Sequence, residues 1–425
     1  MAKKCAQDAY RMLLLDGVLV EGDCPNPDDL SVLADSVFAK RGRQSELVDR
    51  LPQDQFRRAR ANSGYMLVAA LFQESVISSV LTLNFDLAME HALTQLGTLK
   101  VQKIACPEDI PKLAAHNVVY LHRNVNEVDP EKWVLRASVL ANEWEHGWEG
   151  MMAEVLMTSP VVTFAGLGSP AAVLLETTRQ IKARLGAVDV YQVDPQAAAG
   201  NEFFQALAIP AEAFVQLGWD EFMTLLGDRV LAEQIDHLRV VCTTEVATEA
   251  FAIANVDLVI EHLRGMGLVE MGKVRAAWLS LDECYAAHTE RDAPLLAHVV
   301  IAASAVAQAA EAEEVIIRSE VIEFRAGSGA TLTCAMVACG RGIRGWAAME
   351  AEIRRRRAAI PRHDPQPRFA VVGGAIGLPL GELAAPIDIV VEPRPAGDIV
   401  TGEMPLVLLS AHDISRSPGI LSSVL

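Results

Sequence analysis

Four short runs of apolar and often β-branched residues recur along the first half of the chain, and each ends at a polar side chain or a glycine. The segments between them are longer and carry apolar residues at helical spacing. Such alternation is typical of a parallel sheet with helices on both faces, because strands buried on both faces read as continuous apolar runs. The four runs cover residues 78–83, 118–121, 160–165 and 188–193. We therefore expect an α/β fold in which these runs are the interior strands of one parallel sheet.

The residues that directly follow these runs have side chains or backbones suited to ligand binding. They are Asn84, His122, Gly166 and Asp194. In open parallel sheets, ligands bind in the crevice outside the carboxyl ends of the strands. We therefore expect these four positions to face one crevice.

The chain beyond this α/β region changes character twice. Residues 241–310 are mostly helical in pattern and rich in alanine, whereas residues 311–425 alternate strand-like and helical segments. Gly327-Ser328-Gly329 separates two strand-like runs and indicates a hairpin. The segments of this last region are 315–325, 330–338, 345–360, 369–372, 387–391 and 405–410. The sequence thus predicts three parts: an α/β domain over residues 1–240, a helical region over 241–310 and a smaller α/β domain over 311–425.

Charge and hydropathy limit the partners that we expect. Lys and Arg total 37 and Asp and Glu total 55, so the formal net charge of the 425 residues is −18. An acidic surface repels the nucleic-acid backbone, and we interpret the basic run at 354–357 as the solvated end of a helix. No apolar run reaches the roughly 18 residues that a membrane span needs. We expect no direct contact with nucleic acid or with a membrane.

The seven cysteines are scattered, which is typical of free thiols in a reducing compartment. The closest pair, Cys334 and Cys339, lies in a strand-like stretch, and we interpret both as buried small residues rather than zinc ligands. The first residues do not have the pattern of a secretory signal. We therefore expect a cytoplasmic protein without a metal site.

Four motifs in the first 240 residues together carry a resemblance to a known family. Residues 82–86 read TLNFD and resemble a T-x-N-x-D strand-end motif; the other three motifs are VYLH at 119–122, VTFAGLGS at 162–169 and YQVDP at 191–195. Their order and rough spacing resemble those of sirtuin-like NAD-binding domains, and residues 203–223 are similar to the helices that follow in bacterial members. The match covers a little over half of the chain and implies a Rossmann-like domain with NAD as substrate or ligand.

The resemblance assigns catalytic roles to three residues. His122 matches the family's catalytic histidine and would deprotonate a ribose hydroxyl or a water, while Asn84 and Asp86 would hold the ribose. Each residue also has an ordinary structural interpretation. Asp86 can cap the following helix, and a lone histidine at a strand end is usually structural.

The cofactor-binding assignments lie in the later turns. Gly166, Gly168 and Ser169 precede a helix whose N-terminus would favour an anionic group, although the same glycines suit a tight turn without a ligand. Asp194 would hydrogen-bond a ribose, or would only begin the turn before Pro195.

The sequence departs from the family at its first glycine loop. The family has a G-A-G-x-S turn that holds the NAD diphosphate. The corresponding stretch here, residues 15–25, retains only Gly17 and Gly22 as candidate binding positions. It also contains three acidic residues, Asp16, Glu21 and Asp23. Arg123 follows His122 where glycine is usual, and its cation would either close the pocket or replace lost phosphate contacts.

Three hypotheses follow for the function. Stand-alone bacterial relatives, as the resemblance implies, deplete NAD in anti-phage defence, form oligomers and work with a partner protein. The chain would then be an NAD glycohydrolase with weak or partner-dependent activity. Alternatively, it would be an inactive scaffold or nucleotide-sensing subunit, or a different nucleotide-processing hydrolase, because one fold hosts many functions. The four-cysteine zinc module of deacetylating sirtuins has no counterpart here, which disfavours deacetylation.

Overall fold

The computed structural model describes most of the chain. The described residues are 2–97, 101–142, 147–167, 174–175, 178–179, 183, 189–248, 256–278, 293–318, 321–338, 346–373, 399–401, 404–410, 419 and 421. They divide into two compact units. The first unit comprises Met1–Phe72 and Ile77–Thr224, and the second comprises Gln73–Val76 and Leu225–Leu425. The predicted regions 241–310 and 311–425 thus both fall in the second unit.

Helices of the first unit surround two small sheets. They are α1 (Ala2–Leu15), α2 (Leu30–Arg41), α3 (Ser45–Val48), α4 (Gln53–Arg57), α5 (Ser63–Gln73), α6 (Ala88–Leu96), α7 (Ala137–Asn142), α8 (Trp148–Leu156) and α10 (Glu202–Leu207), with 3₁₀ turns η1 (Pro107–Lys112), η2 (Pro130–Lys132), η3 (Ala198–Gly200) and η4 (Ala211–Ala213).

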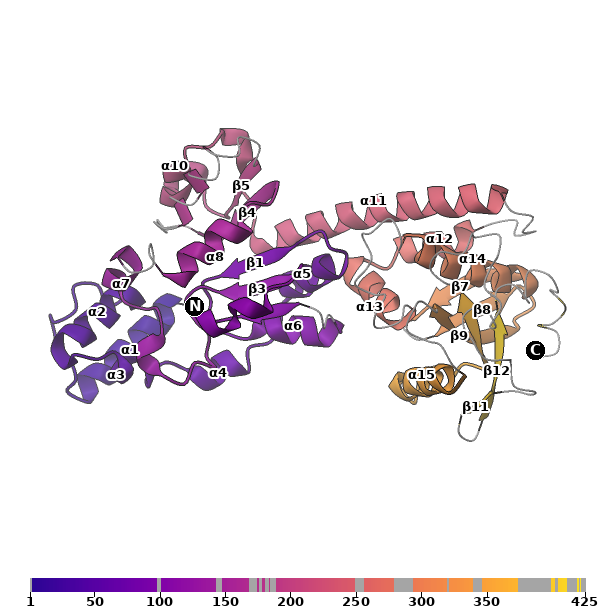
Figure 1. Ribbon diagram of the computed structural model, residues 1–425, viewed down its shortest axis with the longest axis horizontal. Helices are drawn as coiled ribbons and strands as arrows, with labels where there is room; N and C mark the ends of the chain where they lie inside the picture. The colour runs from indigo at the N-terminus through magenta and orange to yellow at the C-terminus, as the bar shows by residue number, and fades with distance from the viewer. Residues whose placement is uncertain are drawn as a thin grey trace. The chain divides into compact units, whose positions relative to one another are not determined.

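The N-terminal helices α1, α2 and α3 pack on one another around a core of their own (Figure 1). Helix α2 begins where the Asp29 carboxylate accepts hydrogen bonds from the backbone N–H groups of Ser31 and Val32, and it ends at Gly42, whose φ of 69° is left-handed. The core includes Leu13 and Leu33, which are fully buried.

The first sheet contains β1 (Ser79–Thr82), β3 (Asn117–Tyr120) and β2 (Gln102–Ile104) in the order β1-β3-β2, and both pairs are parallel. The central strand β3 is buried along its whole length, as its apolar sequence predicted. Strand β1 is only half-buried, because it has a single neighbouring strand.

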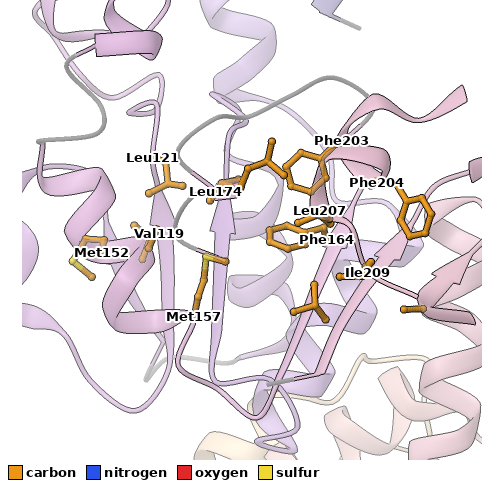
Figure 2. Close-up of a cluster of buried hydrophobic side chains, with 14 of the residues drawn as sticks. Val119, Leu121, Met152, Met157, Phe164, Leu174, Phe203, Phe204, Leu207 and Ile209 are labelled. Carbon is orange, nitrogen blue, oxygen red and sulfur yellow. The ribbon is translucent and has the colours of Figure 1, made fainter. Parts of the chain in front are cut away.

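The second sheet contains β4 (Val161–Ala165), β5 (Asp189–Val193) and β6 (Phe214–Val215) in the order β4-β5-β6, again with parallel pairs. Figure 2 shows the apolar cluster in which side chains from both sheets meet, with Val119 of β3 and Phe164 of β4 among them. Met152 of α8 and Phe203 of α10 complete the same cluster. The two sheets of this unit therefore share one core.

Two expectations for this unit are corrected by the structure. The four predicted strands exist and run parallel to their partners, but among the described residues they form two three-stranded sheets rather than one, so β1 and β4 are edge strands and only β3 and β5 are central. Strand β4 exposes Val161 and Thr163, which a strand covered on both faces would bury. Part of the stretch 203–223, which was expected to resemble the helices of bacterial members, is not helical, because it forms the short turn η4 and strand β6.

The second unit begins within α11 (Trp219–Thr248), a single helix of 30 residues. Its other elements are α12 (Asp257–Arg264), α13 (Leu268–Trp278), α14 (Ala293–Ala309), β7 (Ala312–Ile317), β8 (Ile322–Ala326), β9 (Thr331–Ala338), α15 (Trp346–Ala359), β10 (Phe369–Gly373), β11 (Ile399–Thr401) and β12 (Met404–Ser410).

A mixed sheet with the order β11-β12-β10-β9-β8-β7 organises this unit. The almost wholly apolar helix α14 packs against β7, β9 and β10 (Figure 1). The hairpin predicted at residues 327–329 joins β8 to β9. The run predicted as one strand over 315–325 is two antiparallel strands, β7 and β8, and the segment 387–391 lies outside the described residues.

None of the helices in the described ranges combines the length and the apolar character that crossing a membrane requires.

Candidate functional site

Asn84 lies just beyond the carboxyl end of β1, at the position that the sequence predicted. Its Nδ2 donates a hydrogen bond of 2.9 Å to the hydroxyl of Tyr65 on α5, and its backbone N–H donates to Thr82 Oγ1 at 3.1 Å. The Asn84 residue is exposed, whereas burial raises the pKa of the Tyr65 hydroxyl above its usual value. The carboxamide is therefore accessible from solvent and is oriented by Tyr65.

Asp86 has the structural role that was the alternative to ribose binding. Its Oδ1 accepts a hydrogen bond of 3.0 Å from the backbone N–H of Ala88, the first residue of α6. This is a capping interaction, which satisfies a donor that the helix itself leaves unpaired.

His122 follows β3 and packs against aromatic side chains. The centroid of its ring lies 5.9 Å from that of Phe85, and Phe85 stacks on Trp133 at 5.0 Å. Burial lowers the pKa of His122 to about 4, against a smaller opposing effect of a hydrogen bond with the backbone of Leu83. The imidazole is therefore neutral at neutral pH, and a base with so low a pKa accepts protons weakly.

The three residues expected to act together have different neighbours. Asn84 contacts Tyr65, and Asp86 caps α6, whereas His122 packs on Phe85, the residue between them.

The glycine turn predicted after 160–165 is partly described. Gly166 has a φ of 68°, which favours glycine, and its N–H donates to the carbonyl of Val193 at 3.0 Å. Gly166 thus continues the hydrogen bonding of β4 with β5, and its left-handed φ is a conformation that turns after strands commonly require. Gly168 and Ser169 lie outside the described residues.

Asp194 also begins a turn. Its buried Oδ1 accepts a hydrogen bond of 2.8 Å from the backbone N–H of Gln196, and its own N–H donates to Val215 on β6. The carboxylate thus stabilises the loop after β5.

The first glycine loop differs most from the expectation. It follows α1, so the element before it is a helix and not the strand that precedes a diphosphate-binding turn. Gly17 and Gly22 have φ values of 68° and 89° and form turns between α1 and α2. Two of its three acidic residues have cationic partners: Asp16 pairs with Arg50 at 2.7 Å and Asp23 pairs with Lys40 at 2.9 Å.

Arg123 occupies a backbone conformation that only glycine adopts without strain, with a φ of 70°. Its Nη1 donates a hydrogen bond of 2.9 Å to the carbonyl of Ala105, and its guanidinium carbon lies 5.1 Å from the centre of the Trp148 ring on α8. These contacts hold the cation in one place despite the unfavourable φ.

A cavity of about 260 Å³ opens beside Arg123. The residues that line it come from four separate stretches of the first unit and include three cations and two carboxylates. They are Gln44, Arg123, Glu131, Lys132, Trp133, Val134, Arg136, Val139, Gly147 and Glu149. Sequence reasoning identified only Arg123, because no spacing rule connects residues 44, 123, 136 and 149.

The charged groups of the cavity have different surroundings. The Glu131 carboxylate accepts hydrogen bonds from the backbone N–H groups of Gln44 and Ser45, whereas Arg136 lies over the Phe38 ring at 3.8 Å. Glu149 is 7% exposed, and burial raises the pKa of its carboxyl against a smaller opposing effect of nearby Arg123.

Comparisons with known proteins give no family for the chain. No protein-family description matches it, and no curated protein is significantly similar to it.

Proposed function

We propose that this chain is a sirtuin-like module of Rossmann type that does not hydrolyse NAD efficiently by itself and serves as a scaffold or nucleotide-sensing subunit beside a partner protein. The order of the four motifs and the parallel strands that carry them support the family assignment. The loss of efficient hydrolysis is our inference from the site.

One observation carries this inference. The candidate base, His122, is buried against Phe85, and its pKa is lowered to about 4. A general base works best when its pKa lies near the working pH, so this imidazole would remove a proton from a ribose hydroxyl or a water poorly.

Two further features support the same proposal. The first glycine loop follows a helix, and its carboxylates at Asp16 and Asp23 are engaged by Arg50 and Lys40. Asp86 is used as a cap for α6. A diphosphate would thus meet a loop that follows a helix and contains carboxylates, and a ribose would compete with the backbone contact of Asp86.

The proposal is tested by incubating the purified full chain with NAD and measuring released nicotinamide by chromatography. We expect release no faster than in a His122→Ala variant of the same chain. Release by the parent that greatly exceeds release by His122→Ala would overturn the proposal and favour a glycohydrolase.

Asn84 favours a second candidate, partner-dependent hydrolysis, because its carboxamide remains exposed at the carboxyl end of β1. A partner, or a second copy of the chain, would then have to reorder the first loop. In this candidate the chain acts in the bacterial cytoplasm in anti-phage defence. The assay is repeated with the product of a neighbouring gene; nicotinamide release that depends on both that product and Asn84 would support it.

A further inference from the structure

We propose that the cavity beside Arg123 is a binding site for a small phosphate-bearing ligand that also offers a proton or hydroxyl to donate. The cavity lies within the first unit, and its assignment does not depend on whether the chain binds or hydrolyses NAD.

The size of the cavity limits the ligand. Pockets for drug-sized ligands typically have volumes of about 300–1,000 Å³. A cavity of about 260 Å³ therefore suits inorganic phosphate or a sugar phosphate, and it is too small for a dinucleotide.

Cationic groups converge on this small space. Arg123, Lys132 and Arg136 all line it, and Arg136 has a ring contact with Phe38 that leaves its N–H groups able to bind an anion. Guanidinium groups present several N–H donors in a plane and bind phosphate oxygens well.

The beginning of α8 adds favourable polarity. Gly147, which lines the cavity, is the N-cap of this 9-residue helix, and no side chain accepts a hydrogen bond at that cap. Backbone N–H groups at a helix N-terminus favour an anion, and here one of them, that of Glu149, already donates to the Glu149 carboxyl. The helix thus acts together with the three cations.

Two buried polar atoms beside the cavity lack a hydrogen-bond partner within the described part of the chain. Arg123 Nε and Gln44 Oε1 have no hydrogen-bond partner among the described residues, although both residues line the cavity. Gln44 is 2% exposed, and its Nε2 is already used by the carbonyls of Pro130 and Trp133. Such buried atoms normally find a partner. A ligand in the cavity would supply one after a small shift of the Gln44 and Arg123 side chains, because neither atom is accessible to solvent in this structure.

The acceptors predict which anion is preferred. Gln44 Oε1 and the buried Glu149 carboxyl can accept a hydrogen bond, while the Glu131 carboxylate is held by the backbone N–H groups of Gln44 and Ser45. Inorganic phosphate retains a proton at neutral pH and a sugar phosphate carries hydroxyls, whereas sulfate has nothing to donate. A site with both donors and acceptors should therefore discriminate against sulfate.

Calorimetric titration of the full chain tests the site with three probes: inorganic phosphate, ribose 5-phosphate and sulfate. We expect the two phosphate probes to bind and sulfate to bind about tenfold more weakly or worse, the loss that one unmet charge-assisted hydrogen bond produces. If ribose 5-phosphate binds and inorganic phosphate does not, the site recognises sugar phosphates only. If neither phosphate probe binds, the proposal is overturned.

Three variants locate the binding. Arg136→Gln removes a cation without touching the strained position, and it should weaken phosphate binding about tenfold. Arg11→Gln is the control, because it removes the same charge from a side chain on α1 that is 74% exposed. Unchanged binding by Arg136→Gln, or an equal loss in Arg11→Gln, would show that binding occurs elsewhere.

The third variant, Glu149→Gln, tests the acceptors. It should strengthen sulfate binding and reduce the preference for phosphate, because a repelling carboxylate becomes a neutral amide. Sulfate binding as weak as in the parent would overturn the role of Glu149. Thermal melts of each variant confirm that the fold is intact, and none of these readouts depends on NAD turnover.

Discussion

The burial of His122 lowers its pKa, and this also makes the stability of the folded chain depend on pH. The ring packs on Phe85, and its pKa of about 4 lies below the roughly 6.5 of an exposed histidine. Above pH 6.5 the imidazole is neutral in both the folded and the unfolded chain and does not change the free energy of unfolding.

Between about pH 6.5 and pH 4, His122 binds a proton in the unfolded chain but stays neutral in the folded chain. We therefore expect the free energy of unfolding to fall as the pH drops from about 6.5 towards 4, by about 2–3 kcal/mol in all, from this residue. The measurement is chemical denaturation at a series of pH values for the parent and for His122→Gln, which should lose this part of the slope. His91→Gln, at an exposed position of the same unit, is the control; an equal change of slope in both variants would contradict the assignment.

Among the elements, α5 and α11 meet closely at their first turns. The backbone N–H of Gly64 donates to Asp220 Oδ1 at 3.1 Å, and a Cβ at position 64 would overlap the Trp219 ring and lie 2.9 Å from that Asp220 oxygen. The absence of a side chain at this position is what allows the two helices to approach.

Gly64→Ala should therefore destabilise the first unit by about 1–3 kcal/mol, the usual cost of overpacking. Gly200→Ala is a matched control, because a Cβ there meets nothing within 4 Å. Thermal unfolding followed by circular dichroism measures both variants. A Gly64→Ala protein as stable as the control would show that the Trp219 ring moves aside without cost.

The sequence predicted where the strands lie better than it predicted which strands pair with one another. The strand-like runs at 118–121 and 188–193 correspond to β3 and β5, because central strands of a parallel sheet read as continuous apolar runs. Sequence periodicity does not say which strands are neighbours, so two sheets were expected to be one. The strands β7 and β8 were merged because the sequence between them, residues 318–321, contains no glycine or proline.

The candidate site was predicted less well than the strands. Asn84, His122 and Asp194 all follow strands as expected, but a sequence does not show whether a side chain meets solvent or a core. The contact of His122 with Phe85 depends on tertiary packing, whereas the contact of Asp86 with the first residue of α6 is local and was among the sequence interpretations. The cavity was missed for the same reason, since its lining joins residues from distant parts of the chain.

In the molecule as a whole, the second unit contains its own buried ion pair. Arg275 Nε on α13 lies 2.8 Å from Glu74 Oε1, and their side chains are 6% and 0% exposed. Gln234 on α11 also donates to Glu74, at 2.6 Å. The pair ties the segment Gln73–Val76 to the helices of this unit.

Arg275→Met should destabilise the second unit by about 3–5 kcal/mol, because it leaves the Glu74 charge buried without its cation. The double variant Arg275→Met with Glu74→Gln removes that charge and should recover most of the loss. Scanning calorimetry should show a lower midpoint for one of two transitions while the other, belonging to the first unit, is unchanged. A single transition that moves as a whole would mean that the two units unfold together.

The backbone at Arg123 has a consequence for how this protein changes over evolutionary time. A residue other than glycine at a φ of 70° costs of order 1 kcal/mol, so selection for stability alone would replace this arginine with glycine. Arginine persists there only while its guanidinium is needed. Descendants that have lost both the need for the neighbouring cavity and the contacts of the guanidinium with Ala105 and Trp148 should drift to glycine or asparagine at this position.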